Sequence, residues 1–253
     1  MTVKELYEYL NKRIPSALSC EWDNDGLMCC PKSDREVKKV LVTLDISAEA
    51  VKHAMKNGCD VILSHHPLVF KPLKSLSYDN GVASRLIKLV QNGISAMSFH
   101  TRLDVLPGGV NDALSKKLGL CDVEPFGEDG VMMGRVGYVE ETTLDEFAKT
   151  VKNALGAPAV FYNGQLPVRK VAVLGGGGED FIGAAKKCGA DTFVSGNIGY
   201  HIMADAKEND VNLIEAGHYF TEAPVLDYLA DMVKDADGKI EIIFTDSNNI
   251  KSV

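Results

Sequence analysis

The chain has 253 residues, of which 45% are hydrophobic and 25% are charged, and its formal net charge at pH 7 is −8. This length suffices for one large or two modest domains with a sizeable buried core. The acidic balance argues against nucleic-acid binding, which needs a basic surface to neutralise phosphates. No apolar stretch of the sequence reaches the length of a membrane span, so a membrane is not an expected partner.

The N-terminal segment carries acidic and basic residues in its first turns and lacks the apolar run of a secretory signal. The six cysteines form no C-x-x-C pair and no regular framework. Cys29 and Cys30 are adjacent, which is a poor geometry for an ordinary disulfide. We therefore expect a cytoplasmic protein with reduced thiols.

Apolar β-branched runs alternate with helical patterns along most of the chain. Gly58 and Gly93 each follow a helical pattern, where glycine supplies the left-handed conformation that ends a helix. This βαβαβ rhythm predicts an α/β fold with mostly parallel or mixed sheets flanked by helices. Strands are predicted at 38–44, 60–64, 94–99, 134–139, 159–162, 169–174, 192–195 and 211–216, and helices at 48–57, 83–92, 144–155, 180–187, 200–209 and 223–234.

The rhythm loosens between Cys121 and Gly130, a polar stretch with glycine and proline that is expected to join two lobes. We predict a metal-binding α/β lobe formed by 1–125 and 215–253, and a second α/β lobe formed by 126–214. In this arrangement the chain returns from the second lobe to the first with its last cluster of polar residues.

Four of the six histidines lie in three short clusters that closely follow predicted strands. Loops converge beyond the carboxyl ends of parallel strands, where α/β proteins place their sites. Imidazoles and carboxylates delivered there are suitable ligands for first-row transition metals. The clusters are Ser64-His65-His66-Pro67, His100-Thr101-Arg102-Leu103-Asp104 and Gly217-His218-Tyr219-Phe220-Thr221-Glu222.

Each candidate ligand alone has an ordinary structural interpretation, such as a buried histidine pair or a carboxylate at a helix N-terminus. Together they exceed the ligands of a single structural zinc, so we predict a dinuclear centre with ions about 3.5–4 Å apart. The expected ions are Fe, Zn or Mn, and Glu222 is the candidate bridging carboxylate. The candidate ligands are His65, His66, Asp104, His218 and Glu222.

The i,i+4 spacing of His218 and Glu222 would align them on a helix. Pro224 disfavours a helix that begins before about Thr221. The prediction therefore places His218 in a strand-exit loop and Glu222 in the first helical turn, with Thr221 as its N-cap.

Two other histidines are candidate catalytic residues. His100 is expected to orient Asp104 or a metal-bound water rather than to bind the metal directly. His201 opens a predicted helix, where it is either a solvent-facing residue or a proton-transfer group.

Two further motifs receive no catalytic role. The glycine run 175–178 lacks the Lys-Ser/Thr of a phosphate-binding P-loop, so a tight strand-to-helix turn is the better interpretation. Trp22, the only tryptophan, is expected to pack inward while a neighbouring Asp or Asn holds a turn.

These motifs, in this order, resemble those of the GTP cyclohydrolase 1 type 2 homologue family, also described as NGG-interacting-factor-like dinuclear metal-centre proteins. The resemblance covers essentially the whole chain. Longer members of that family carry an extra domain inserted in the middle, which this chain is expected to lack. The motifs are Trp22-Asp-Asn-x-Gly-Leu27, Ser64-His-His-Pro-Leu68, His100-Thr-x-Leu-Asp104, the glycines at 175–178 and Gly217-His-Tyr-x-Thr-Glu222.

The resemblance implies two α/β lobes, the same five metal ligands, and a toroidal homohexamer whose metal sites face an inner cavity. It also implies GTP-type ring opening, in which water attacks C8 of guanine before formate leaves. Arg102 is then the candidate partner of the phosphates, followed by Lys71 and Lys74. One departure is Asn197, where the family usually has an acidic residue.

We therefore expect a metal-dependent hydrolase that acts on a cyclic amide or nucleotide-like small molecule. One ion would activate a water molecule and the second would polarise the electrophile. The alternative is a non-catalytic metal-binding oligomeric scaffold or regulatory protein, which would use the same kinds of ligand.

Overall fold

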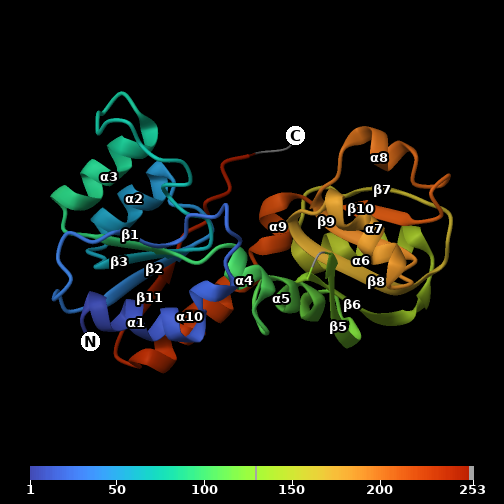
Figure 1. The fold of residues 1–253 in the computed structure, drawn as a ribbon, viewed down its shortest axis with the longest axis horizontal. Helices are drawn as coiled ribbons and strands as arrows, with labels where there is room; N and C mark the ends of the chain where they lie inside the picture. The colour runs from blue at the N-terminus through green and yellow to red at the C-terminus, as the bar shows by residue number, and fades with distance from the viewer. Residues whose placement is uncertain (129, 251–253) are drawn as a thin grey trace. The chain divides into compact units, whose positions relative to one another are not determined.

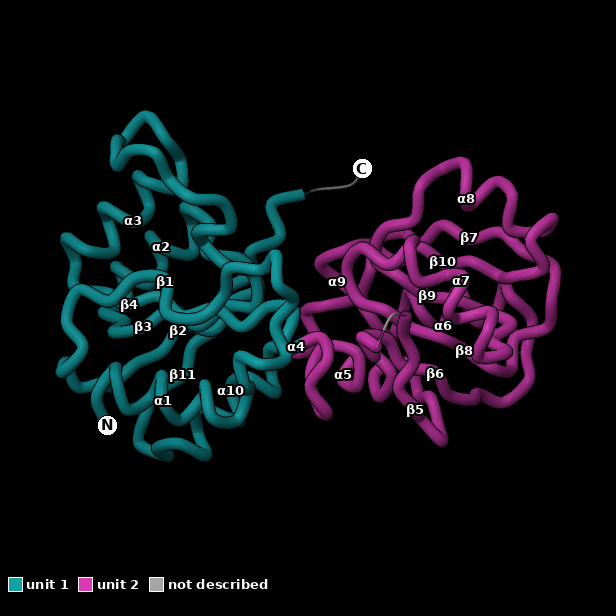
Figure 2. The backbone as a smooth tube through the Cα atoms, in the orientation of Figure 1, with its two compact units in different colours: residues 1–103, 226–251 teal, residues 104–225, 252–253 magenta. Residues whose placement is uncertain are grey.

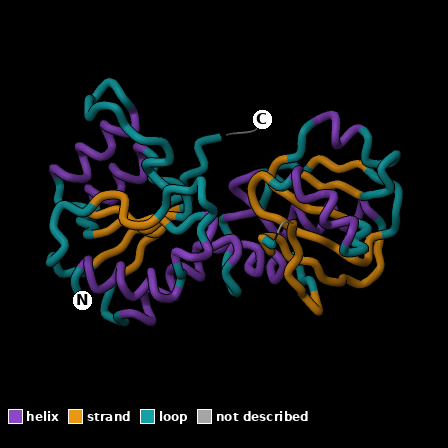
Figure 3. Tube along the Cα trace, in the orientation of Figure 1, coloured by secondary structure: helices purple, strands orange, loops and turns teal. Residues whose placement is uncertain are grey.

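The computed structural model describes residues 1–128 and 130–250, and the chain divides into two compact units (Figures 1 and 2). Unit 1 comprises Met1–Leu103 and Leu226–Lys251, and unit 2 comprises Asp104–Val225. Each unit contains its own sheet and helices (Figure 3). The predicted α/β class with mixed sheets is confirmed.

Unit 1 contains one five-stranded sheet. Its strands and helices are β1 (Gly26–Cys29), β2 (Lys39–Thr43), β3 (Val61–Ser64), β4 (Ser95–Ser98), β11 (Glu241–Phe244), α1 (Val3–Arg13), α2 (Ala48–Lys56), α3 (Gly81–Gln91) and α10 (Val225–Ala236), with a 3-10 turn η1 (Ser16–Leu18). The strand order is β1-β4-β3-β2-β11. The neighbours β11, β2, β3 and β4 are parallel, and β1 is antiparallel to β4.

The central strands of unit 1 are buried along their whole length because helices cover both faces of the sheet. Helices α2 and α3 lie on one face, and α1 and α10 lie on the other (Figure 1). The core beneath α2 and α3 joins helix residues such as Val51 and Leu89 to strand residues such as Leu41 and Ile62. This packing fixes the strand ends from which the histidines project.

Unit 2 contains a six-stranded sheet in the order β5-β6-β8-β9-β10-β7. Its elements are β5 (Cys121–Glu128), β6 (Val131–Thr142), β7 (Phe161–Asn163), β8 (Val168–Gly177), β9 (Thr192–Asn197), β10 (Asn212–Glu215), α5 (Val110–Lys117), α6 (Leu144–Leu155), η2 (Glu179–Phe181), α7 (Ile182–Lys187), α8 (Tyr200–Ala204) and α9 (His218–Glu222), while α4 (Thr101–Val105) contains the division between the units. Strands β8, β9 and β10 are parallel, and the outer pairings are antiparallel.

Segments 104–125 and 215–225, which were predicted to lie in the first lobe, belong to unit 2. Helices α5 and α9 both pack against β8 of the six-stranded sheet. Leu114 and Leu118 join the core of unit 2, which explains why this part of the chain follows that sheet.

The polar stretch expected to join two lobes is instead strand β5, at the edge of the sheet. Its first five residues are exposed, so it lacks the alternation of apolar side chains by which strands are recognised. Its backbone pairs with β6 through an irregular antiparallel register. Among the described residues, no helix combines the length and apolar character that a membrane crossing requires.

Candidate metal centre

Three histidines of unit 1, His65, His66 and His100, form a compact cluster. Their ring centroids lie 4.8 Å (His65–His66), 5.2 Å (His65–His100) and 5.6 Å (His66–His100) apart. One ring nitrogen from each lies within 4.8 Å of the other two. Strands β3 and β4 are parallel neighbours, and the histidines lie just beyond their carboxyl ends. Strand β3 ends at Ser64, so the two consecutive histidines are released from the alternating directions of a regular strand.

The three rings of this cluster share one hydrogen-bonding pattern: each Nδ1 faces an oxygen that can only accept. Each Nδ1 therefore carries a proton, and in the neutral ring Nε2 keeps a lone pair. Oxygen acceptors fix metal-binding histidines in this way. The acceptors are the Phe99 carbonyl for His65 (3.0 Å), Asp45 Oδ1 for His66 (2.8 Å) and Asp23 Oδ1 for His100 (2.8 Å).

Asp23, for which only a role in a turn is expected from the sequence, holds His100 in place. Its side chain is fully buried, and Oδ2 accepts hydrogen bonds from the backbone N (3.0 Å) and Oγ1 (2.6 Å) of Thr101. Burial alone raises the pKa of Asp23, but hydrogen bonds from His100 and Thr101 outweigh burial and hold this pKa well below its usual range.

Replacing Asp23 with Asn is expected to destabilise the protein by about 1.5–3 kcal/mol at neutral pH, because an amide cannot replace all the acceptor positions of the buried carboxylate. The folded-state pKa of Asp23 is lowered. Its contribution is therefore present above the unfolded pKa of about 3.9 and is lost as the pH falls through the folded value. Urea unfolding of both proteins at a series of pH values should show the difference shrinking below about pH 4. A difference that is constant with pH would contradict a role for the charge.

His218 and Glu222 lie on one turn of α9 in unit 2. Nε2 of His218 lies 3.1 Å from Oε2 of Glu222, whose side chain is 6% exposed. Nδ1 of His218 lies 2.8 Å from Oδ1 of Asn197 at the end of β9. Asn197 therefore still supplies an oxygen acceptor at the position where the resembled family usually has an acid.

The predicted placement of His218 in a loop before the helix is wrong. Helix α9 begins at His218 and ends at Glu222, and the Ala223 N–H donates to the Tyr219 carbonyl (2.8 Å). Pro224 follows the helix rather than preventing it, because the last hydrogen bond of α9 is made before the proline. The structure thus has His218 and Glu222 aligned at i,i+4 on one helix, in place of the predicted loop and first turn.

Two glycines allow α9 to approach β8 and β9 closely. Gly176 has a φ of +69°, and a Cβ there would overlap Oε1 of Glu222. A Cβ on Gly196 would lie 2.6 Å from the Gly176 carbonyl oxygen and 2.7 Å from Cα of His218. The Gly176 N–H donates to Oγ1 of Thr221 (3.1 Å), so Thr221 ties α9 to β8 instead of capping a helix.

The two remaining candidate site residues, Asp104 and His201, lie on the short helices α4 and α8. Asp104 lies in α4, and its backbone carbonyl accepts a hydrogen bond from Asn111 Nδ2 (3.2 Å). His201 is exposed on α8, where its ring meets that of Tyr200 at 5.5 Å. Within the described part of unit 2, no cluster of ligating groups includes His201.

Arg102 does not have the predicted phosphate-binding role. Its side chain is 1% exposed, and Nε pairs with Asp25 Oδ2 at 2.8 Å. Nη1 donates to Asn11 Oδ1 (2.7 Å) and to the Ile14 carbonyl (2.9 Å). The guanidinium group is therefore part of the interior of unit 1 and does not reach solvent.

The inward packing predicted for Trp22 is also wrong, because 63% of this residue is exposed. The adjacent Asp23 is the buried member of the motif. A sequence that places Trp beside Asp and Asn does not reveal which side chain turns inward, because the decisive contacts of Asp23 are with residues 77 and 78 positions away.

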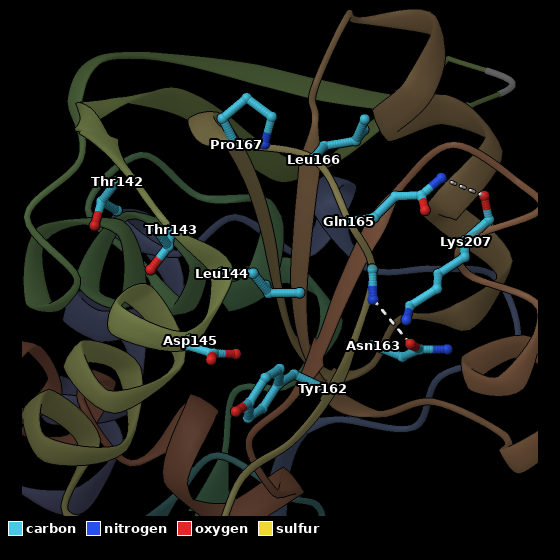
Figure 4. Close-up of a pocket in the computed structure, with 11 residues that line it drawn as sticks. Thr142, Thr143, Leu144, Asp145, Tyr162, Asn163, Gln165, Leu166, Pro167 and Lys207 are labelled. Atoms are coloured by element: carbon cyan, nitrogen blue, oxygen red, sulfur yellow. Dashed lines mark hydrogen bonds between the residues drawn. The ribbon is translucent and has the colours of Figure 1, made fainter.

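A pocket of about 440 Å³ lies elsewhere in unit 2, between the start of α6 and strand β7 (Figure 4). Asp145 and Tyr162 line it, and a hydrogen bond with Asp145 raises the pKa of Tyr162. None of the candidate site residues lines this pocket, so it is separate from the ligand groups.

The donor groups fit a transition metal. Imidazole Nε2 atoms and a carboxylate suit Fe, Zn and Mn, and the oxygen acceptors at Nδ1 orient the rings for coordination. These observations define a two-unit α/β protein with a histidine-rich candidate metal site. The chain belongs to the Duf34/NIF3 (NGG1p interacting factor 3) family, whose model matches residues 1–250.

Relatives of known name or structure cover nearly the whole chain. A GTP cyclohydrolase 1 type 2 homolog from Clostridium perfringens is 33% identical over 251 residues, covering 96% of this chain and 95% of the relative. Staphylococcus aureus protein SA1388 has a similar structure, with a TM-score of 0.90, 27% identity, and coverage of 100% of this chain and 99% of that one. Reduced HcgD from Methanocaldococcus jannaschii gives a TM-score of 0.83 at 30% identity and covers 96% and 97% of the two chains.

Proposed function

We propose that this protein is a metal-dependent hydrolase that acts on a cyclic amide or a nucleotide-like substrate. The proposed ligands of its two divalent ions are His65, His66, Asp104, His218 and Glu222. The observation that carries the proposal is the shared orientation of the histidines in both units, where each Nδ1 is held by an oxygen acceptor. The names of the curated relatives favour ring opening of the GTP cyclohydrolase type.

Divalent ions in such a centre supply activated water and polarise the bond under attack. The histidines would hold the ions through Nε2, while Phe99, Asp45 and Asn197 keep their rings in place from the Nδ1 side. His100 is the proposed group that orients or moves a proton at the substrate, because Asp23 fixes its ring beside the other two histidines. His201 remains a second candidate for proton transfer.

The proposal extends to the assembly and location of the protein. A cytoplasmic homohexamer, the form implied by the family resemblance, is the proposed working state. Lys71 and Lys74, both exposed in unit 1, remain the candidate partners of substrate phosphates.

A chelation and reloading experiment tests the hydrolase. Metal content is measured on freshly purified protein, and turnover of GTP and other cyclic amides is measured on the purified, chelated and reloaded forms. We expect turnover that disappears on chelation and returns with Fe, Zn or Mn. Fully loaded protein that turns over none of these compounds would overturn the hydrolase and favour the alternative, a metal-binding scaffold.

A further inference from the structure

Two exposed aromatic side chains stand beside the histidine cluster of unit 1. Trp22 is 63% exposed and Phe70 is 43% exposed. Removal of a large aromatic side chain from water contributes much favourable free energy. Two such side chains left exposed together therefore favour a binding surface. The candidate metal site leaves both side chains without a role.

The rings of Trp22, Phe70 and His100 lie at nearly equal distances from one another. Trp22 lies 6.1 Å from Phe70 and 6.2 Å from His100, and Phe70 lies 6.1 Å from His100. The interplanar angles are 71°, 77° and 87°, so each pair meets edge to face. The ring centroids of His100 and His65 lie 5.2 Å apart, so this group of three rings adjoins the candidate ligands.

The loop that carries Trp22 is fixed on both sides of the indole. The next residue, Asp23, is buried and bonded to His100 and Thr101. Asn24 donates through Nδ2 to the Val69 carbonyl, which joins the loop to the segment that carries Phe70. The exposed indole is therefore preorganised, and a ligand that stacks on it does not have to order the loop.

We infer that Trp22 and Phe70 form the seat for a planar heteroaromatic ring of the substrate, which stacks on the indole next to the histidine cluster. This inference rests on the proposed function, and it adds the residues that would hold the ring of the substrate. Every nucleobase has a π-face, so stacking selects for a flat ring and leaves discrimination among rings to polar contacts. Trp22 is thus a specificity residue, distinct from the metal ligands.

Because Trp22 is the only tryptophan, its fluorescence reports directly on this seat. The metal-loaded protein is titrated with guanosine, and with ribose 5-phosphate and tripolyphosphate as probes without an aromatic ring. We expect saturable quenching by guanosine and none by the other two. Absence of saturable quenching would overturn the inference. Fluorescence that changes when the protein is diluted but not when guanosine is added would also overturn it, because a second copy of the chain would then cover the indole.

Variants measured by equilibrium dialysis separate stacking from folding. Trp22→Ala is expected to weaken guanosine binding by about 5- to 150-fold, the range for loss of base–aromatic stacking. Trp22→Phe keeps a ring and should retain most of the affinity. Phe161→Ala is the matched control, because Phe161 is 65% exposed on β7 of unit 2. Equal affinity of Trp22→Ala and wild type would contradict the seat.

The two proposals fail in different ways. Guanosine binding that depends on Trp22, without turnover of any substrate, supports the seat while the hydrolase fails. Turnover with the same KM in wild type and Trp22→Ala would support the hydrolase and refute the stacking of the substrate ring on Trp22.

Discussion

Replacing His65 with Ala is expected to abolish tight metal binding. His65 is fully buried, and its Nδ1 is held by the Phe99 carbonyl. Loss of an outer partner of a metal ligand typically lowers affinity by about 10- to 100-fold, and loss of a ligand should exceed that. Metal content per chain after dialysis, and the rise in Tm when metal is added, measure the effect without relying on activity.

His53 provides the matched control for this experiment. It lies on α2 in the same unit, and its Nδ1 meets Oγ1 of Thr245 at 3.0 Å, outside the histidine cluster. His53→Ala should keep the metal content and the metal-dependent rise in Tm. His66→Ala is a second test with less risk to folding, because the side chain of His66 is 21% exposed. Normal metal content in folded His65→Ala and His66→Ala would refute the assignment of ligands.

Gly196→Ala is expected to destabilise unit 2 and to displace α9. The new Cβ would lie 2.6 Å from the Gly176 carbonyl oxygen and 2.7 Å from Cα of His218. Both are backbone atoms, so a side-chain rotation cannot relieve the contact. Overpacking of this kind costs about 1–3 kcal/mol. Denaturant unfolding measures the loss, and a titration with metal should show weaker binding if His218 and Glu222 are ligands.

The contrasting substitution is Gly183→Ala in α7 of the same unit. A Cβ at Gly183 meets nothing within 4 Å. Replacing glycine with alanine within a helix stabilises it by up to about 1 kcal/mol, so this variant should equal or exceed the wild type in stability. If Gly196→Ala and Gly183→Ala unfold at the same denaturant concentration, the close approach of α9 is not important for stability.

Much of the architecture could be predicted because buried parallel strands consist of runs of apolar residues. The runs at 60–64 and 94–99 became β3 and β4, and the histidines follow them. Edge strands carry a weaker signal, since one edge is unpaired and much of the surface faces solvent. Strands β1, β5 and β11 were therefore not predicted. Of these, β5 is the clearest case, with most of its side chains exposed.

The candidate site could be predicted only in part. His65, His66 and His100 stood out because histidine is rare in this chain and these residues end apolar runs. The contact between Asp23 and His100 could not be recognised from the sequence, because it depends on how the strands that lie between these two residues pair with one another. Local rules fail at two places. Pro224 disfavours a helix before it, yet α9 ends before the proline. The sequence neighbours of Arg102 indicate a role beside the histidines, although its carboxylate partner is Asp25.

The position of β11 has a consequence for biosynthesis. Glu241 to Phe244 pair in register with Lys39 to Val42 of β2, and the whole of unit 2 lies between these strands in the sequence (Figure 1). A ribosome therefore translates unit 2 completely before the sheet of unit 1 can reach its full width. During that interval the edge of β2 that pairs with β11 has no partner strand, and such an edge can pair with another chain.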